Sequence, residues 1–142
     1  MSYYAISQKL KTILETVRDG AGGRLAEIYD TQVPTSPEYP YATISSGDAT
    51  EDTLDTELNK TLYRFTIRAV NVSEDKVATE TTMRKLADDI LAELRKRENQ
   101  TLGGTVDRFL PYTLTWGYEN GNTVPNRYFE IQLEILQHYS ID

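Results

Sequence analysis

The acidic segment 47–57 holds the side chains best suited to bind a metal ion. Its five carboxylates, with no basic residue among them, are Asp48, Glu51, Asp52, Asp55 and Glu57. Carboxylate oxygens suit Ca²⁺ or Mg²⁺, but the segment lacks the alternating ligands and central glycine of a calcium-binding loop. Like charges this dense resist compaction, so we interpret the segment as a solvated loop or hairpin tip that faces a partner. A divalent-metal enzyme and an adaptor for a basic peptide are the alternatives.

Other catalytic arrangements find little support in the residues. The single histidine, His138, lies beside Ser140 and Asp142, but neighbours on one terminal segment do not converge as a catalytic triad requires. The chain has no cysteine and no HExxH or GxSxG motif. The glycine-rich run 20–23 follows a predicted helix, whereas a phosphate-binding loop precedes one. We therefore expect neither an enzyme nor a bound cofactor.

Length and composition indicate one soluble globular domain over residues 1–142. Hydrophobic residues make up 39% of the chain and charged residues 26%, which is ordinary for a folded protein. The 15 basic and 22 acidic residues give a net charge of 15 − 22 = −7, so the overall field disfavours binding to nucleic acid. No stretch has the pattern of a signal peptide or the apolar length of a membrane span.

Two segments have the apolar periodicity of amphipathic helices. The first begins after Ser2, a predicted N-cap, and ends before Gly20. Its apolar stripe is Ile6, Leu10, Ile13, Leu14 and Val17. The second is predicted to be capped by Ser73 and closed by Gly103 and Gly104. Its stripe is Met83, Leu86, Ala87, Ile90, Leu91 and Leu94.

The remaining apolar segments read as strands. They are Leu25–Asp30, Tyr41–Ser46, Asn59–Val70, Thr105–Trp116 and Tyr128–Leu136. Prolines at 34, 37 and 40 predict an extended connector, and Pro111 makes its segment an edge or bulged strand. Asn120-Gly121 is a strong hairpin signal. These elements predict an α+β fold, in which two amphipathic helices pack on one face of an antiparallel or mixed sheet.

Opposite charges alternate on the predicted outer face of the sheet. Arg64 and Arg68 lie on one strand, and Glu130 and Glu134 lie on another. They are either cross-strand ion pairs within one chain or a subunit interface in which patches on different copies meet head to tail. Tyrosines add a second signal for protein contact, or else form the rim of the core. Those on loops and on the outer face are Tyr39, Tyr41, Tyr112, Tyr118 and Tyr128.

In order, these pieces resemble the tail-terminator (tail-completion) proteins of long-tailed bacteriophages. The resemblance rests on the N-terminal helix, then EYPYATISSGDATED, the strand NKTLYRFTIRAV, the helix TMRKLADDILAEL and the strand RYFEIQLEI. It covers most of the chain as an ordering of elements, with no catalytic signature. Neck and head-completion proteins of similar size share much of this order and are the alternative.

The resemblance implies a structural role in the virion. Such proteins form a ring, hexameric in this family, on the head-proximal end of the tail tube. The ring ends polymerisation of the tail-tube protein and offers a surface to a neck or head-completion protein. DNA would pass through without specific binding, which an acidic chain suits. The resemblance thus implies assembly in the host cytoplasm and no membrane partner.

Overall fold

A computed structural model describes residues 3–20, 22–30, 32–53, 58–73, 75–102, 108–109, 112–120 and 124–140. The elements, in chain order, are α1 (Tyr3–Asp19), β1 (Glu27–Tyr29), β2 (Tyr41–Thr53), β3 (Leu58–Val72), α2 (Lys76–Arg95), α3 (Arg97–Gln100), β4 (Arg108–Phe109), β5 (Thr113–Glu119) and β6 (Asn126–Ser140).

The described strands form one mixed sheet in the order β1-β2-β3-β6-β4, and β5 also pairs with β6. Only β1 and β2 run parallel; the other pairs are antiparallel. β4 and β5 follow one another along the same edge of β6, because β3 occupies its other edge. The predicted α+β class is confirmed, including the edge position of the segment around Pro111, a residue outside the described ones.

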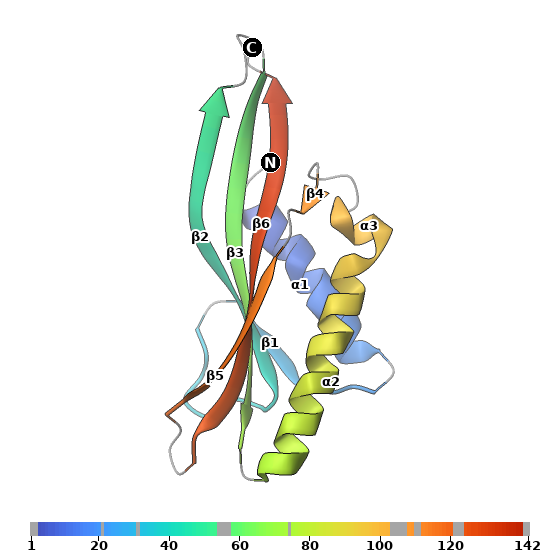
Figure 1. The fold of residues 1–142 in the computed structure, drawn as a ribbon, viewed down its shortest axis with the longest axis vertical. Helices are drawn as coiled ribbons and strands as arrows, with labels where there is room; N and C mark the ends of the chain where they lie inside the picture. Colours follow the sequence, from blue (N-terminus) through green and yellow to red (C-terminus); the bar gives the residue numbers. More distant parts are fainter. Residues whose placement is uncertain are drawn as a thin grey trace.

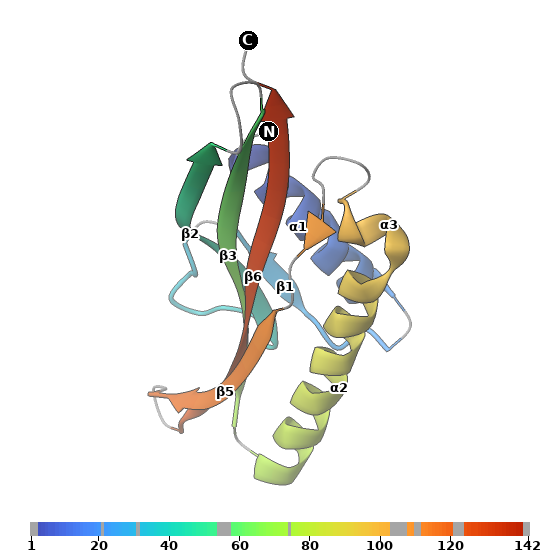
Figure 2. The ribbon, with the colours of Figure 1, turned by 45° about the horizontal axis from the view of Figure 1, so that its top comes forward.

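One face of the sheet carries the helices and the core. The predicted stripes of α1 and α2 are buried except Leu91, which is partly buried and packs against the core. They meet the alternate residues of β3 and β6 that were predicted to face inward, Phe65, Ile67, Ala69, Phe129, Ile131, Leu133 and Ile135. Beyond the helices, β2, β3 and β6 continue together (Figure 1, Figure 2). We call residues 49–53, 58–63 and 135–140 the arm; its base still contacts the core through Ile135 and Tyr63.

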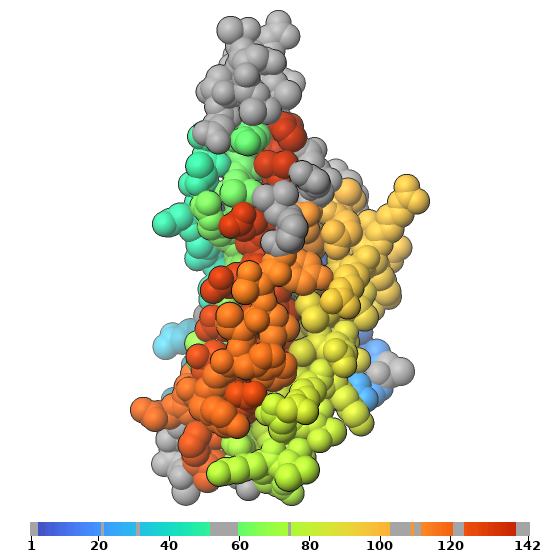
Figure 3. Space-filling view, viewed as in Figure 1, coloured from blue at the N-terminus to red at the C-terminus, as the bar shows by residue number. Residues whose placement is uncertain are grey.

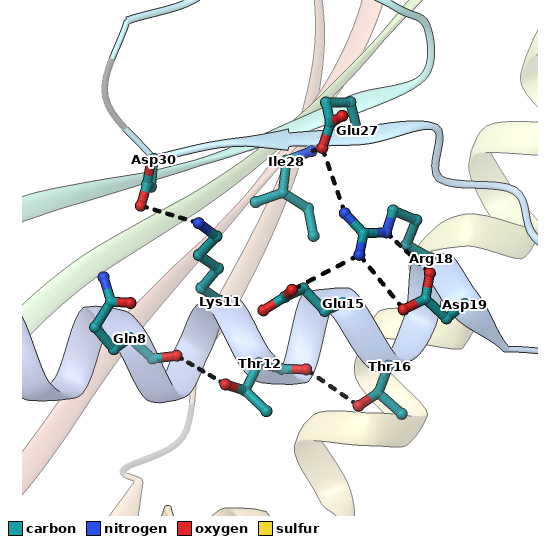
Figure 4. A network of polar contacts seen from close by, with 10 residues as sticks. All are labelled: Gln8, Lys11, Thr12, Glu15, Thr16, Arg18, Asp19, Glu27, Ile28 and Asp30. Carbon is teal, nitrogen blue, oxygen red and sulfur yellow. Dashed lines mark hydrogen bonds and ion pairs between the residues drawn. The ribbon is translucent and has the colours of Figure 1, made fainter.

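Ion pairs attach α1 to the short strand β1 (Figure 4). The ammonium of Lys11 lies 3.4 Å from the carboxylate of Asp30, and the guanidinium of Arg18 lies 3.4 Å from that of Glu27. Arg18 also reaches Asp19 at 3.0 Å, and this hydrogen bond lowers the pKa of the Asp19 carboxyl. β1 was expected over Leu25–Asp30, and the structure confirms a shorter strand there.

The limits of α2 differ from the prediction at both ends. The N-cap is Asp75 and not Ser73, because the Asp75 carboxylate accepts hydrogen bonds from the backbone of Val77 and Ala78, each at 3.1 Å. The helix ends at Arg95, where Lys96 leaves helical geometry, and α3 follows as a separate turn. The predicted N-cap Ser2 and the glycines at 103 and 104 lie outside the described residues.

Segment 47–57 was predicted to be a solvated loop or hairpin tip. Residues 47–51 are exposed as predicted, but residues 47–53 belong to a strand and not to a loop. β2 runs through Thr53 and pairs with β3 up to the match of Thr53 with Asn59. Hydrogen bonding along β3 outweighs the repulsion between carboxylates, since the two whose side chains are described, Asp48 and Glu51, are exposed to water. Residues 54–57, which include Asp55 and Glu57, lie outside the described residues.

Candidate interaction surface

The register of β3 on β6 pairs the four predicted interface charges within one chain. Arg64 lies opposite Glu134 and Arg68 opposite Glu130. The nitrogen–oxygen distances are 3.8 Å for the first pair and 3.0 Å for the second. The intrachain explanation is therefore confirmed, and these charges no longer argue for a seam between copies.

Arg68 is the centre of a polar cluster on the outer face. Its guanidinium binds Glu130 and also Glu119 of β5. It lies 4.0 Å from the centre of the Tyr128 ring, a cation–π contact. The same ring covers Gly117, where an added Cβ would lie 2.6 Å from the tyrosine oxygen. Arg68 thus holds three strands together, so a substitution there would disturb the monomer before any contact between copies.

Arg64 makes weaker contacts toward the arm. It donates to the hydroxyl of Thr50 at 3.0 Å and to the backbone carbonyl of Asp48 at 3.4 Å. Its ion pair with Glu134 is long, and both side chains are about two-fifths exposed, 40% and 44%. Exposed pairs of this kind contribute roughly 0–1 kcal/mol.

The predicted acidic cluster does not converge. Asp48 and Glu51 are exposed on β2. The Glu51 carboxylate accepts a hydrogen bond from the Thr61 hydroxyl at 3.4 Å, and the backbone register places Asp52 opposite Lys60. Within the described ranges, no group of three or more acidic or histidine residues could hold a metal ion.

The predicted contact tyrosines divide into two kinds. Tyr41 is buried, and burial together with the nearby Glu119 carboxylate raises the pKa of its phenol. Tyr128 lies beneath Arg68, and Tyr112 packs on the core. Only Tyr39 and Tyr118 are exposed, at 37% and 58%. The core-rim explanation therefore holds for Tyr112, whereas Tyr41 packs against Tyr29 and Tyr39, and Tyr128 packs under Arg68.

β5 lies beside the first half of α2 (Figure 3), and two exposed aromatic side chains of β5 mark a surface there. Tyr118 was among the predicted contact tyrosines, whereas Trp116 was not predicted. The rings are those of Trp116 and Tyr118, whose exposed fractions are 37% and 58%, and Val77, 78% exposed, lies in the first turn of α2. We call this surface the aromatic corner, and it includes Arg127 and Glu80, which lie beneath the rings. Tyr118 and Arg127 are cross-strand partners, and Val77 lies one helical turn before Glu80. The signal available in the sequence was Trp-x-Tyr on an edge strand.

Arg127 braces this corner from below. Its guanidinium lies 4.9 Å from the Trp116 ring centre and 4.6 Å from that of Tyr118. It also binds the Glu80 carboxylate at 2.8 and 3.1 Å. These hydrogen bonds lower the pKa of the Glu80 carboxyl, and Arg84 contributes to the same shift. The Trp116 and Tyr118 rings are thus held by the Arg127 guanidinium, whose charge is neutralised by the Glu80 carboxylate.

Two open hollows lie along the helices. One, of about 200 Å³, is lined by Lys9, Thr12, Ile13, Glu98, Asn99 and Leu102. The other, of about 170 Å³, is lined by Thr16, Val17, Gly20, Asp89, Ala92 and Glu93. Neither holds a histidine or an arrangement of nucleophile and base. We assign them no chemistry.

Comparison with known proteins leaves the family open. No protein-family model matches the chain, and no curated protein matches it either. In the part of the chain that the structure describes, the helices are too short or too polar to cross a membrane.

Proposed function

We propose that the protein is a structural subunit at the head-proximal end of a bacteriophage tail. Copies of the chain would form a ring on the tail tube, end its polymerisation and provide a surface for head joining. The supporting observation is the aromatic corner, because fixed and exposed Trp and Tyr side chains are typical of protein–protein contacts. The order of elements also agrees with the resemblance in the sequence.

The corner has properties that favour association. The Arg127 charge is already paired with Glu80, so covering the rings would not leave an unpaired charge out of water. The rings make cation–π contacts with Arg127, which hydrogen bonds to Glu80 hold in place, and this lowers the entropy lost when a partner orders them. A contact between this corner and a different surface of the next copy is heterologous and can close into a ring.

The experiment compares oligomers of the wild type with those of a double variant, Trp116→Ala with Tyr118→Ala. The matched control is Tyr4→Ala, because Tyr4 is 74% exposed on α1, away from the corner. Sedimentation velocity with and without tail tubes should show rings or tube binding for wild type and control, and their loss in the double variant. Equal assembly of all three proteins would contradict a role for the corner.

Pull-down separates the tail terminator from a neck or head-completion protein. The proposal expects capture of tail tubes made of the tail-tube protein. Capture by the portal side of the head alone would instead support the neck assignment.

A further inference from the structure

β2 carries a bulge where the arm leaves the body of the protein. Ser46 pairs with Phe65 and Ala49 pairs with Tyr63, so Gly47 and Asp48 together lie opposite the single residue Arg64. A bulge of this kind interrupts the ladder and bends the strand.

Each carbonyl of the bulge is held by a side chain from a different face of the sheet. From the helix side, the Tyr3 hydroxyl donates to the Gly47 carbonyl at 2.8 Å. From the outer face, the Arg64 guanidinium donates to the Asp48 carbonyl at 3.4 Å and to the Thr50 hydroxyl at 3.0 Å. The irregular backbone is thus clamped on both sides.

Tyr3 belongs to the first turn of α1, so this contact joins the beginning of the described chain to the arm. Its ring also meets Tyr63 edge-on, with centroids 5.0 Å apart, and Phe65 at 5.6 Å. Both partners lie on β3 beside the bulge. Gly47 also allows β2 to approach β3 closely at the bulge, because an added Cβ would lie 3.2 Å from the Cβ of Arg64 and 3.3 Å from the Arg64 carbonyl oxygen.

We propose that this two-sided clamp couples the first turn of α1 to the arm, so that the arm keeps its direction only while Tyr3 is seated on the bulge. β3 and β6 stay paired without a break along the arm. Release of Tyr3 therefore loosens the outer part of β2 and its pairing with β3 before it affects the body. The coupling is a property of the single chain and does not depend on the proposed ring.

The test is hydrogen exchange of the arm amides in Tyr3→Phe, which removes the hydroxyl and keeps the ring. The matched control is Tyr4→Phe, in the same turn of α1 but 74% exposed. In Tyr3→Phe we expect the amides of 49–53, and those of 58–63 that bond to β2, to exchange about fivefold faster, the factor for one hydrogen bond of about 1 kcal/mol. Amides in the buried half of α2 should not change.

A second pair of variants tests the outer clamp. Arg64→Met should also speed exchange in 49–53, whereas Glu134→Gln, which removes only the long ion pair, should not. Identical arm exchange in Tyr3→Phe and Tyr4→Phe would overturn the proposal. So would equal acceleration of the arm and of α2, because that result indicates general destabilisation without coupling.

Discussion

The outer face of the sheet has two halves built from the same charges with different strengths. In one, Arg68 binds Glu119 and Glu130 and lies over the Tyr128 ring. In the other, Arg64 has only a long ion pair with Glu134 and two bonds to β2. The difference comes from β5, which supplies Glu119 beside Arg68 and has already ended beside Arg64. The charges are spaced equally along β3 and β6, so each arginine lies opposite a glutamate. The number of contacts that each arginine makes then depends on whether the third strand, β5, reaches it.

Among the variants that compare the two halves, Arg68→Ala is expected to lower the free energy of unfolding most. It leaves two carboxylates without their shared cation and uncovers Tyr128. We expect the free energy of unfolding to fall by about 2–3 kcal/mol, the range for hydrogen bonds to charged groups. Urea denaturation measures the loss. A change below that of Arg64→Ala would reverse the comparison.

A somewhat smaller loss is expected from Gly117→Ala in the Arg68 half. The new methyl group would lie 2.6 Å from the Tyr128 oxygen and 2.7 Å from the ring carbon that bears it. The ring must leave its present position beneath Arg68, which costs about 1–2 kcal/mol. Gly47→Ala is the control from the other half, where the closest contact is 3.2 Å. Thermal unfolding of both variants should show the greater loss for Gly117→Ala.

The pH dependence of stability tests the ion pair between Glu80 and Arg127 in the aromatic corner. The pKa of this carboxyl is lowered from 4.5 in the folded protein, chiefly by the hydrogen bond from Arg127. Its contribution to stability is therefore complete above pH 4.5 and is lost as the pH falls through the lower folded pKa.

Glu80→Gln should accordingly be less stable than wild type by about 1 kcal/mol at pH 7, with the gap closing below pH 4. Urea midpoints at pH 7 and pH 3.5 measure this. A gap that widens on acidification would contradict the ion pair as the cause.

The smallest effect is expected from Arg64→Ala. An exposed pair of this length contributes roughly 0–1 kcal/mol, and the Arg64 bonds to β2 affect local opening of the arm, so global urea unfolding should change least in this variant. Loss of 2 kcal/mol or more would show that the arm half is held as firmly as the Arg68 half, and the contrast would fail.

Periodicity predicted the helices, the inward faces of β3 and β6 and the class of the fold, because each depends on which side chains avoid water. For Arg64 and Arg68, the sequence allowed either ion pairs within one chain or an interface between copies. The pattern of a strand does not say whether the strand beside it belongs to the same chain. The extension of β2 through Asp52 was missed, because pairing with β3 is a long-range interaction that local charge density hides.

The aromatic corner was predicted only in part, through Tyr118, for a related reason. Trp116 and Tyr118 share an edge strand, but their exposure depends on where α2 and Arg127 lie. The cap at Asp75 in place of Ser73 reflects a choice between two good capping residues only two positions apart.

The central claim is that copies of this chain assemble on the end of a tail tube through exposed aromatic side chains. Negative-stain electron microscopy of the purified protein mixed with tail tubes examines it directly. The account predicts a ring at one end of each tube and no such ring with the Trp116→Ala, Tyr118→Ala variant. Bare tube ends with the wild-type protein at high concentration would contradict it.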